Sequence, residues 1–332
     1  MEASFPCYWV SKDDQGRVRG EVRHIESDSL PEGDVLVRVA YSSLNYKDAL
    51  AATGHPGVAR QLPHVPGIDA AGTVEESSSP EFPPGKEVLI TGYSMGETRF
   101  GGWSQFVRMP AEYVVRLPAG LTTKEAMIYG TAGFTAAQSV AAIVERDVTP
   151  ERGPVVVTGA SGGVGSLAVA LLAKLGFHVV AVSGKPAATE LLTRLGAAEV
   201  VGRDVLRDAS DRPLLSARWA AAVDTVGGRP LSTILRSTDH RGVVTACGLV
   251  AGAELPITVY PFILRGVNLV GIDSAHCPMD RRLEIWSRLA GPWKIEQLDS
   301  LAETTTLAGL DHYVQKILAG QIIGRTVVEL AD

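Results

Sequence analysis

The chain has 332 residues and a formal net charge of −6, with 45% hydrophobic residues and 35 glycines. The hydrophobic share excludes a disordered chain, and the absence of a three-residue glycine period excludes collagen. The length predicts two domains, and the acidic balance argues against a general nucleic-acid binder.

The N-terminus and the cysteines give no sign of export or of a membrane anchor. The first residues, MEASFPCYWVSKDD, lack the basic and apolar regions of a signal peptide. No uninterrupted apolar run approaches the roughly 18 residues of a transmembrane helix. Cys7, Cys247 and Cys277 are far apart and show no zinc or disulfide spacing. We therefore expect a cytoplasmic protein without a membrane partner.

The N-terminal third is predicted to be rich in β-strands. Runs of β-branched residues at 35–39 and 87–90 are bounded by Gly, Pro and Asp, and residues 46–52 predict a short helix. From about residue 122, helices alternate with short buried strands, which is typical of βαβ units and a parallel sheet. The expected helices there are 123–129, 134–145, 166–175, 186–195, 280–289 and 307–319, and the expected strands are 154–158, 178–182, 221–224, 243–246, 267–272 and 326–330.

A glycine-rich segment, Thr158–Ser166, follows the first of these buried strands and opens a helix. Its first glycine allows a tight turn, the middle pair lets backbone approach a pyrophosphate, and the last lets helix pack on strand. The helix dipole favours an anion at this end. An ordinary strand–helix turn is the alternative. The candidate dinucleotide contacts are Ser161, Gly162, Gly163 and Val164.

The end of the second strand predicts which dinucleotide is bound. An NAD site carries an Asp or Glu there for the ribose 2′-OH, but this chain has Ser183-Gly184-Lys185. Arg203, at the end of the third strand, is expected to reach the same corner. A hydroxyl and two cations suit a 2′-phosphate, so the sequence predicts NADPH. The alternative is that Lys185 and Arg203 are solvated surface charges.

Five motifs occur in the order that one family has. They are SSLNYKD at 42–48, VPGIDAAG at 65–72, GGWSQFV at 101–107, GTAGFTA at 130–136 and the glycine-rich segment. Through them the chain resembles the medium-chain dehydrogenase/reductase superfamily, in its zinc-free, quinone-oxidoreductase-like branch. Motifs at 31–34, 182–185, 246–249, 261–265 and 271–274 are also similar to those of bacterial NADPH-dependent acrylyl-CoA reductases.

The resemblance implies an α/β fold in which a Rossmann domain, a doubly wound parallel sheet, is inserted into a β-rich GroES-like catalytic domain. The first part of the catalytic domain is expected at 1–121, the Rossmann NADPH-binding domain at 122–274, and the return to the catalytic domain at 275–332. A homodimer is also expected, because in this superfamily the counterpart of the apolar strand 267–272 often pairs across a two-fold axis.

The resemblance also allows zinc binding to be judged position by position. Alcohol dehydrogenases of the superfamily carry a cysteine ligand where this chain has Asn45 and a histidine ligand where it has Ile68. Neither side chain is a plausible zinc ligand. Residues 92–109, the counterpart of the structural zinc lobe, contain no cysteine. We therefore expect no metal, and a substrate that reacts without one.

An enoyl thioester or an enone meets that requirement, because its carbonyl already polarises the double bond. Hydride adds to the β-carbon, an enolate forms, and protonation at the α-carbon completes the reduction. Asn45 and Tyr46 are the candidate catalytic residues, and the resemblance places Tyr46 against the cofactor. The alternatives are a structural amide and a packed ring.

The expected function is NADPH-dependent reduction of acrylyl-CoA to propanoyl-CoA. A quinone or enone reductase and a non-enzymatic NADPH-binding protein are the alternatives. The resemblance also implies that Leu249, Ile263 and Ser274 line the cofactor, although core packing stays open for Leu249 and Ile263. Arg325 is a candidate for a cofactor or substrate phosphate. The arginines that could serve the phosphates of CoA, or be ordinary surface residues, are Arg60, Arg99, Arg108 and Arg265.

Overall fold

The computed structural model of the chain describes residues 4–330. It forms two compact units. Within the described residues, the first comprises 4–131, Ala275–Gly291 and 296–330, and the second comprises Ala132–Ser274 and Pro292–Ile295. The units divide inside helix α2 (Thr123–Val144), whereas the change in sequence texture suggests a boundary at residues 121 and 122.

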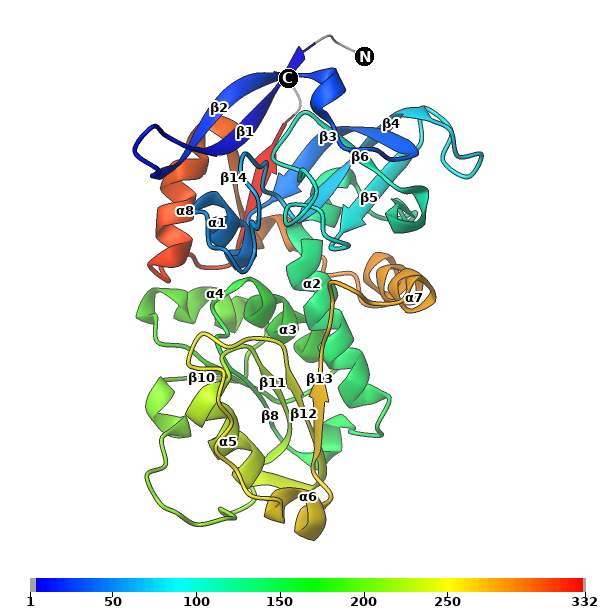
Figure 1. The fold of residues 1–332 in the computed structure, drawn as a ribbon. Coiled ribbons are helices and arrows are strands. Elements are labelled where there is room, and N and C mark those ends of the chain that lie inside the picture. The colour runs from blue at the N-terminus through cyan, green and yellow to red at the C-terminus, as the bar shows by residue number, and fades with distance from the viewer. Residues whose placement is uncertain (1–3, 331–332) are drawn as a thin grey trace. The chain divides into compact units, whose positions relative to one another are not determined.

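The first unit is built on a seven-stranded sheet in the order β14-β15-β3-β4-β5-β7, with β6 also paired to β3 (Figure 1). Its strands are β3 (Val35–Ser43), β4 (Asp69–Ser77), β5 (Glu87–Thr91), β6 (Phe106–Met109), β7 (Val115–Arg116), β14 (Ala302–Thr306) and β15 (Arg325–Glu329). The unit also contains the antiparallel pair β1 (Ser4–Lys12) and β2 (Val18–Glu26), and the helices α1 (Tyr46–Ala52), α7 (Met279–Ala290) and α8 (Leu310–Leu318). Since β15 pairs with β3, the C-terminal segment completes a sheet that begins near the N-terminus.

The central strand β3 is buried on both of its faces. Val35, Val37 and Val39 alternate along it and belong to one core cluster, while Leu36 belongs to a second cluster. Alternate residues of a strand point to opposite faces of the sheet, so this β-branched run joins the two cores. Burying one such side chain contributes about 1.5–3 kcal/mol.

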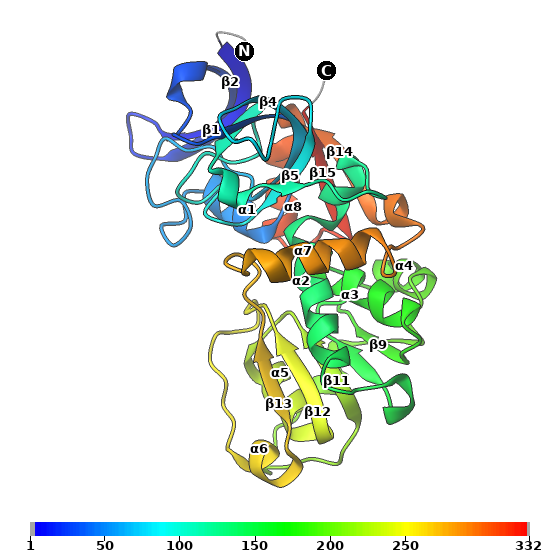
Figure 2. The same ribbon diagram turned by 90° about the vertical axis from the view of Figure 1, so that its right-hand side faces the viewer.

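The second unit is built on a six-stranded parallel sheet in the order β10-β9-β8-β11-β12-β13 (Figure 2). Its strands are β8 (Val155–Val157), β9 (Val179–Val182), β10 (Glu199–Val201), β11 (Trp219–Asp224), β12 (Thr238–Ala246) and β13 (Asn268–Gly271). Its helices include α3 (Gly163–Lys174), α4 (Thr189–Arg194), α5 (Gly228–Ser237) and α6 (Tyr260–Arg265). This strand order is that of a doubly wound dinucleotide-binding sheet, so the predicted fold class is confirmed.

Helix α2 joins the two predicted helices 123–129 and 134–145 into one element of 22 residues. Its backbone leaves the helical region at Gly130, where φ is 49° and ψ is −156°, so two helical halves meet at a kink. Among the described residues, α2 is the one helix long and apolar enough to cross a membrane, but 89% of that stretch is buried inside the protein. The helix therefore packs as a core element.

Candidate functional site

The glycine-rich segment forms a tight turn between β8 and α3. Gly159 has φ of +54°, and its carbonyl accepts a 2.9 Å hydrogen bond from the Gly162 N–H. A Cβ at Gly165 would lie 2.3 Å from the same carbonyl oxygen, so glycine is required where α3 passes the turn. No side chain in the described part of the chain caps α3 at Gly162. The first N–H groups and the dipole of α3 are therefore available to an anion, as a pyrophosphate requires.

A buried carboxylate that the sequence analysis missed fixes this turn. Asp224, at the end of β11, accepts hydrogen bonds from the Thr158 hydroxyl at 2.8 Å and from the Gly227 N–H at 2.7 Å. Thr225 completes the link through two 2.9 Å hydrogen bonds with Thr158. Burial raises the pKa of Asp224 above its ordinary value. The sequence does carry a signal for this contact: the polar pair Asp224-Thr225 directly follows the apolar residues of β11.

Most of the predicted cofactor residues in this unit follow the carboxyl end of a strand. Because the strands are parallel, these ends share one edge of the sheet with the glycine-rich turn, where doubly wound folds bind their ligands. In the spatial order of the strands, Arg203 follows β10, Ser183–Lys185 follow β9, Leu249 follows β12 and Ser274 follows β13.

Lys185 and Arg203 share the corner beside β9. The Arg203 side chain lies over the backbone of Gly184, where a Cβ would come within 2.4 Å of the arginine Nε. Burial lowers the pKa of Lys185, and the charge of Arg203 lowers it further. Ser183 accepts a 3.1 Å hydrogen bond from the Lys185 N–H. Two neighbouring cations repel each other, so an anion at this corner would relieve the repulsion.

Ile263 lies elsewhere in the second unit. Its helix, α6, precedes the amino end of β13, and Figures 1 and 2 both show α6 at the end of the sheet away from α3. Arg265 holds α6 there by donating to the carbonyls of Leu215, Arg236 and Thr238. Ile263 is 68% exposed. This chain therefore does not bring Ile263 to the glycine-rich turn, and its role at the cofactor stays a prediction.

Asn45 and Tyr46 stand at the start of α1 in the first unit. Asn45 caps the helix: its side chain accepts from the N–H at position 48, and the Asp48 side chain bonds the Asn45 N–H at 2.8 Å. Tyr46 is the first helical residue and is 46% exposed. Its hydroxyl has no hydrogen-bond partner among residues 4–330. The geometry therefore fixes Asn45 tightly and presents Tyr46 outward.

The Asp69 carboxylate joins four segments of the first unit. It accepts hydrogen bonds from the Ser43 hydroxyl at 2.5 Å and from the Asn45 amide at 2.8 Å. The Thr131 N–H and hydroxyl donate to Asp69 Oδ1 at 2.9 and 2.6 Å. Arg325 lies 3.9 Å away and donates to Asn45 Oδ1 at 3.1 Å. Both ends of the Asn45 amide are thus engaged within the chain, which favours a structural role for it.

Asp48 and Arg325 complete a cluster of three buried charged side chains with Asp69. Asp48 accepts hydrogen bonds from the N–H groups of Asn45 and Ile68, both at 2.8 Å. Burial and the nearby Asp69 raise the pKa of Asp48 to about 7. Burial also lowers the pKa of Arg325, an effect that the two carboxylates oppose. A proton on Asp48 leaves one carboxylate to balance one guanidinium.

Arg325 is only 3% exposed, and it also donates to the carbonyls of Ile128 and Leu44. Its guanidinium is therefore engaged inside the first unit, an arrangement that does not support the predicted contact with a phosphate. Of the four other arginines considered, Arg265 is also engaged by carbonyl oxygens. Arg99 donates to the Glu32 carbonyl at 2.7 Å, and Arg108 lies 3.9 Å from Glu76. Arg60 differs, because it lines a cavity.

A zinc ion does not fit the position that the alcohol dehydrogenases of the superfamily use. The Asn45 amide nitrogen donates to Asp69 and its oxygen accepts from Arg325, so neither atom points freely at a metal. Ile68 offers only an apolar side chain. Within residues 4–330, no group of three or more His, Cys, Asp or Glu residues is arranged to hold a metal ion. The side chains at this position therefore do not suit a zinc ion.

Cys247 is a weak candidate nucleophile. Burial, followed by the charge of Asp224, raises the pKa of its thiol to about 12. Its Sγ lies 3.4 Å from the Asp224 carbonyl oxygen as a hydrogen-bond donor. The thiolate is the reactive form of cysteine, so the raised pKa disfavours a nucleophilic role for Cys247 at neutral pH.

Two family models match the chain. Residues 31–119 match the alcohol dehydrogenase GroES-like domain, and residues 163–288 match the family described as zinc-binding dehydrogenase. The chain belongs to the medium-chain dehydrogenase/reductase superfamily and is an oxidoreductase, as the sequence motifs predicted.

Two curated relatives are similar to the chain over nearly its whole length. The acrylyl-CoA reductase AcuI of Ruegeria pomeroyi is 46% identical over 327 residues, which cover 98% of this chain and 99% of the relative. The putative quinone oxidoreductase YhfP of Bacillus subtilis is 45% identical over 310 residues, with 93% and 94% coverage. The resemblance therefore extends to both substrate classes considered from the sequence.

Solved structures show the same fold with nicotinamide dinucleotides bound. The yhdH oxidoreductase from Salmonella enterica, in complex with NADP, superposes with a TM-score of 0.95 at 46% identity, covering 98% of this chain and 100% of that one. Bacillus subtilis yhfP, with NAD bound, superposes with a TM-score of 0.96 at 43% identity, covering 99% and 100%.

The buried carboxyl pair predicts a stability that depends on pH. Asp48 has a folded-state pKa of about 7, well above the roughly 3.9 of an unfolded aspartate. The folded state therefore binds the extra proton, and the resulting stabilisation is complete below about pH 4 and is lost as the pH rises through about 7. We expect the free energy of unfolding of the wild type, relative to Asp48→Asn, to fall by roughly 1 kcal/mol per pH unit between about pH 5 and 7.

Urea unfolding of both proteins from pH 5 to 8 measures this difference. The matched control is Asp14→Asn, which alters an exposed acid of the same unit. A constant gap between wild type and Asp48→Asn over the whole pH range would contradict a proton held on Asp48.

Proposed function

We propose that the protein reduces the activated C=C bond of an enoyl thioester with NADPH, and that acrylyl-CoA, which becomes propanoyl-CoA, is its substrate. The observation that carries the cofactor choice is the corner where Lys185 and Arg203 lie together, with no acidic residue at positions 183–185. The 46% identity to an acrylyl-CoA reductase over nearly the whole chain supports the substrate.

Each part of the second unit's edge has a role in holding the cofactor. The turn from Ser161 to Val164 receives the pyrophosphate, because the helix dipole and N–H groups favour an anion there. Ser183, Lys185 and Arg203 hold the 2′-phosphate through charge-assisted hydrogen bonds. When bound, NADPH supplies the hydride for the reaction.

The first unit orients the acceptor and stabilises its enolate. Tyr46 presents its exposed phenol from the start of α1, where it donates a hydrogen bond to the enolate oxygen or contacts the nicotinamide. Asn45 and Asp69 hold the start of α1 in place through the hydrogen bonds described above. The substrate carbonyl polarises its own double bond, so the step needs no metal.

Reduction of a quinone or enone is the second candidate function. It is supported by the 45% identity to a putative quinone oxidoreductase. Both substrate classes are conjugated hydride acceptors and would use the same cofactor. The two candidate functions therefore differ in which residues bind the rest of the substrate molecule.

The proposed assembly is a cytoplasmic homodimer formed through β13. This strand is at the edge of the six-stranded sheet, and three of its four residues are exposed. An exposed strand edge is a template for pairing with another chain.

Replacing Lys185 and Arg203 together with alanine is expected to raise the Kd for NADPH by about 10- to 100-fold, because a hydrogen bond to a charged group contributes about 1.5–3 kcal/mol. The Kd for NADH should change by less than about threefold. Fluorescence titration of both cofactors measures the effect, with Arg212→Ala as a control for an exposed arginine of the same unit. Equal losses for the two cofactors would contradict the 2′-phosphate assignment.

Steady-state oxidation of NADPH with acrylyl-CoA and with a panel of quinones and enones tests the substrate. We expect kcat/KM for acrylyl-CoA to exceed that for any quinone by at least about 100-fold, equivalent to about 2.7 kcal/mol of transition-state binding. A quinone that reacts faster than acrylyl-CoA would support the second candidate function. Tight NADPH binding without turnover of any acceptor would favour a non-enzymatic role.

A further inference from the structure

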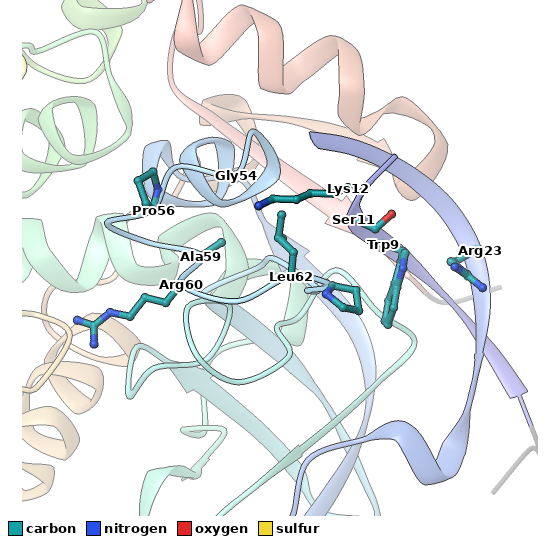
Figure 3. Close-up of a pocket in the computed structure, with 10 residues that line it drawn as sticks. Trp9, Ser11, Lys12, Arg23, Gly54, Pro56, Ala59, Arg60 and Leu62 are labelled. Carbon is teal, nitrogen blue, oxygen red and sulfur yellow. The ribbon is translucent and has the colours of Figure 1, made fainter. Parts of the chain in front are cut away.

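A cavity of about 520 Å³ lies in the first unit beside β1 (Figure 3). Its wall is formed by the second half of β1, one residue of β2, and the segment that follows α1. Figure 3 shows Lys12 lying across the cavity, with Arg23 beyond Trp9 on one side and Arg60 on the other. The lining residues are Trp9, Ser11, Lys12, Arg23, Gly54, Pro56, Ala59, Arg60, Leu62 and Pro63.

The cavity is basic although the chain is acidic. Three of its lining residues, Lys12, Arg23 and Arg60, are cations and none is acidic, whereas the whole chain has a net charge of −6. All three cations are exposed, and none forms an ion pair with any of residues 4–330. An anionic ligand would therefore meet positive charge that is not already neutralised by the protein.

Apart from Ser11, the remaining lining residues are apolar, and contacts within the unit hold the wall in place. Trp9 packs edge-to-face on Phe100, with ring centroids 5.7 Å apart, and the Arg23 guanidinium lies over the Trp9 ring at 5.3 Å. Two 2.8 Å backbone hydrogen bonds between Val10 and His64 tie β1 to the segment after α1. That segment is anchored by a small core of its own, in which Ala59 is buried. A preformed wall loses little entropy when a ligand binds.

We propose that this cavity binds the phosphorylated nucleotide end of the acyl-CoA substrate. Trp9 and the neighbouring Leu62 and Pro63 would receive the adenine ring, and Lys12, Arg23 and Arg60 the phosphate groups. A volume of about 520 Å³ is within the usual range for nucleotide-sized ligands. This inference rests on the proposed function for the identity of the ligand, but the chemistry of the cavity is independent of it.

The cavity follows the candidate reacting end closely along the chain, as a CoA thioester would require. Tyr46, the candidate at the reacting end, begins α1, and Gly54, two residues beyond the end of α1, lines the cavity. Seven helical residues span only about 10 Å. In CoA a flexible pantetheine arm separates the thioester from the nucleotide, so the two ends of one substrate can occupy the start of α1 and the cavity together.

NADPH carries a phosphorylated adenosine of similar chemistry, so the experiment must separate the two sources. The test variant is the double substitution Lys12→Ala and Arg60→Ala, and the control is Lys86→Ala, which removes an exposed cation of the same unit that does not line the cavity. Each variant is assayed with acrylyl-CoA, with acrylyl-pantetheine, which lacks the nucleotide, and with NADPH as the varied substrate.

We expect the KM for acrylyl-CoA to rise about tenfold or more in the double variant, because two charge-assisted contacts are lost. The KM for acrylyl-pantetheine and the KM for NADPH should match those of Lys86→Ala within about twofold. Raising the ionic strength should weaken binding of acrylyl-CoA to the wild type more than to the double variant. With Lys12 intact, Arg60→Lys keeps the positive charge and should therefore lose less affinity for acrylyl-CoA than Arg60→Ala.

Two results would overturn the proposal: equal losses with acrylyl-CoA and acrylyl-pantetheine, or a loss confined to NADPH. If the wild type reduces no enoyl thioester, the proposed function fails by itself, and calorimetry with adenosine 3′,5′-bisphosphate then decides the cavity. Binding that the double variant weakens tenfold or more would support a nucleotide site. Binding of equal strength in both proteins, or none in the wild type, would refute it.

Discussion

The carboxylate of Asp69 is the contact on which the first unit's candidate site depends. Fully buried at the start of β4, it accepts hydrogen bonds from the end of β3, the cap of α1 and the kink of α2, and it lies next to Arg325 at the start of β15. Leaving such a group without partners would cost several kcal/mol, so each of these segments is constrained by the need to satisfy it. The kink itself belongs to this constraint, because a Cβ at Gly130 would lie 2.5 Å from Asp69 Oδ2.

Asn45 shows how the cluster takes the place of a metal site. In zinc-dependent members of the superfamily a cysteine ligand stands at its position, whereas here an amide donates to Asp69 and accepts from Arg325. An amide offers a donor and an acceptor on one planar group, which suits a carboxylate and a guanidinium on either side. The hydrogen bonds orient the start of α1, and Tyr46 next to it keeps an exposed ring for the chemistry we propose.

In the second unit, too, a buried carboxylate anchors the candidate site, and here it is that of Asp224. Asp224 accepts hydrogen bonds from Thr158 and Gly227, so the glycine-rich turn is anchored to the neighbouring strand. The carboxyl ends of parallel strands then bring Ser183, Lys185 and Arg203 to the same edge. In both units a buried carboxylate that takes no part in the proposed chemistry holds the backbone on which the site is built.

Much of the second unit could be predicted because its signals are local. The glycine-rich turn, the short buried strands and the pair Lys185 and Arg203 each lie within a few residues of an element that the sequence pattern identifies. The hydrogen bonds around Asp69 could not be predicted in this way, because they join residues as far apart as Asn45 and Arg325, 280 residues along the chain. The place of Ile263 in the fold could not be predicted for a related reason: a resemblance to a family gives a position in the sequence, whereas the end of the sheet at which α6 lies depends on how the strand after it pairs.

Hydrogen–deuterium exchange on the Asp69→Asn variant tests the role of this carboxylate most directly. We expect faster exchange than in wild type at residues 45–52 and at residues 128–135, because the cap of α1 and the kink of α2 lose their shared acceptor. Exchange in the six-stranded sheet of the second unit should stay unchanged. Wild-type protection at both segments in the variant would contradict the claim that Asp69 holds them together.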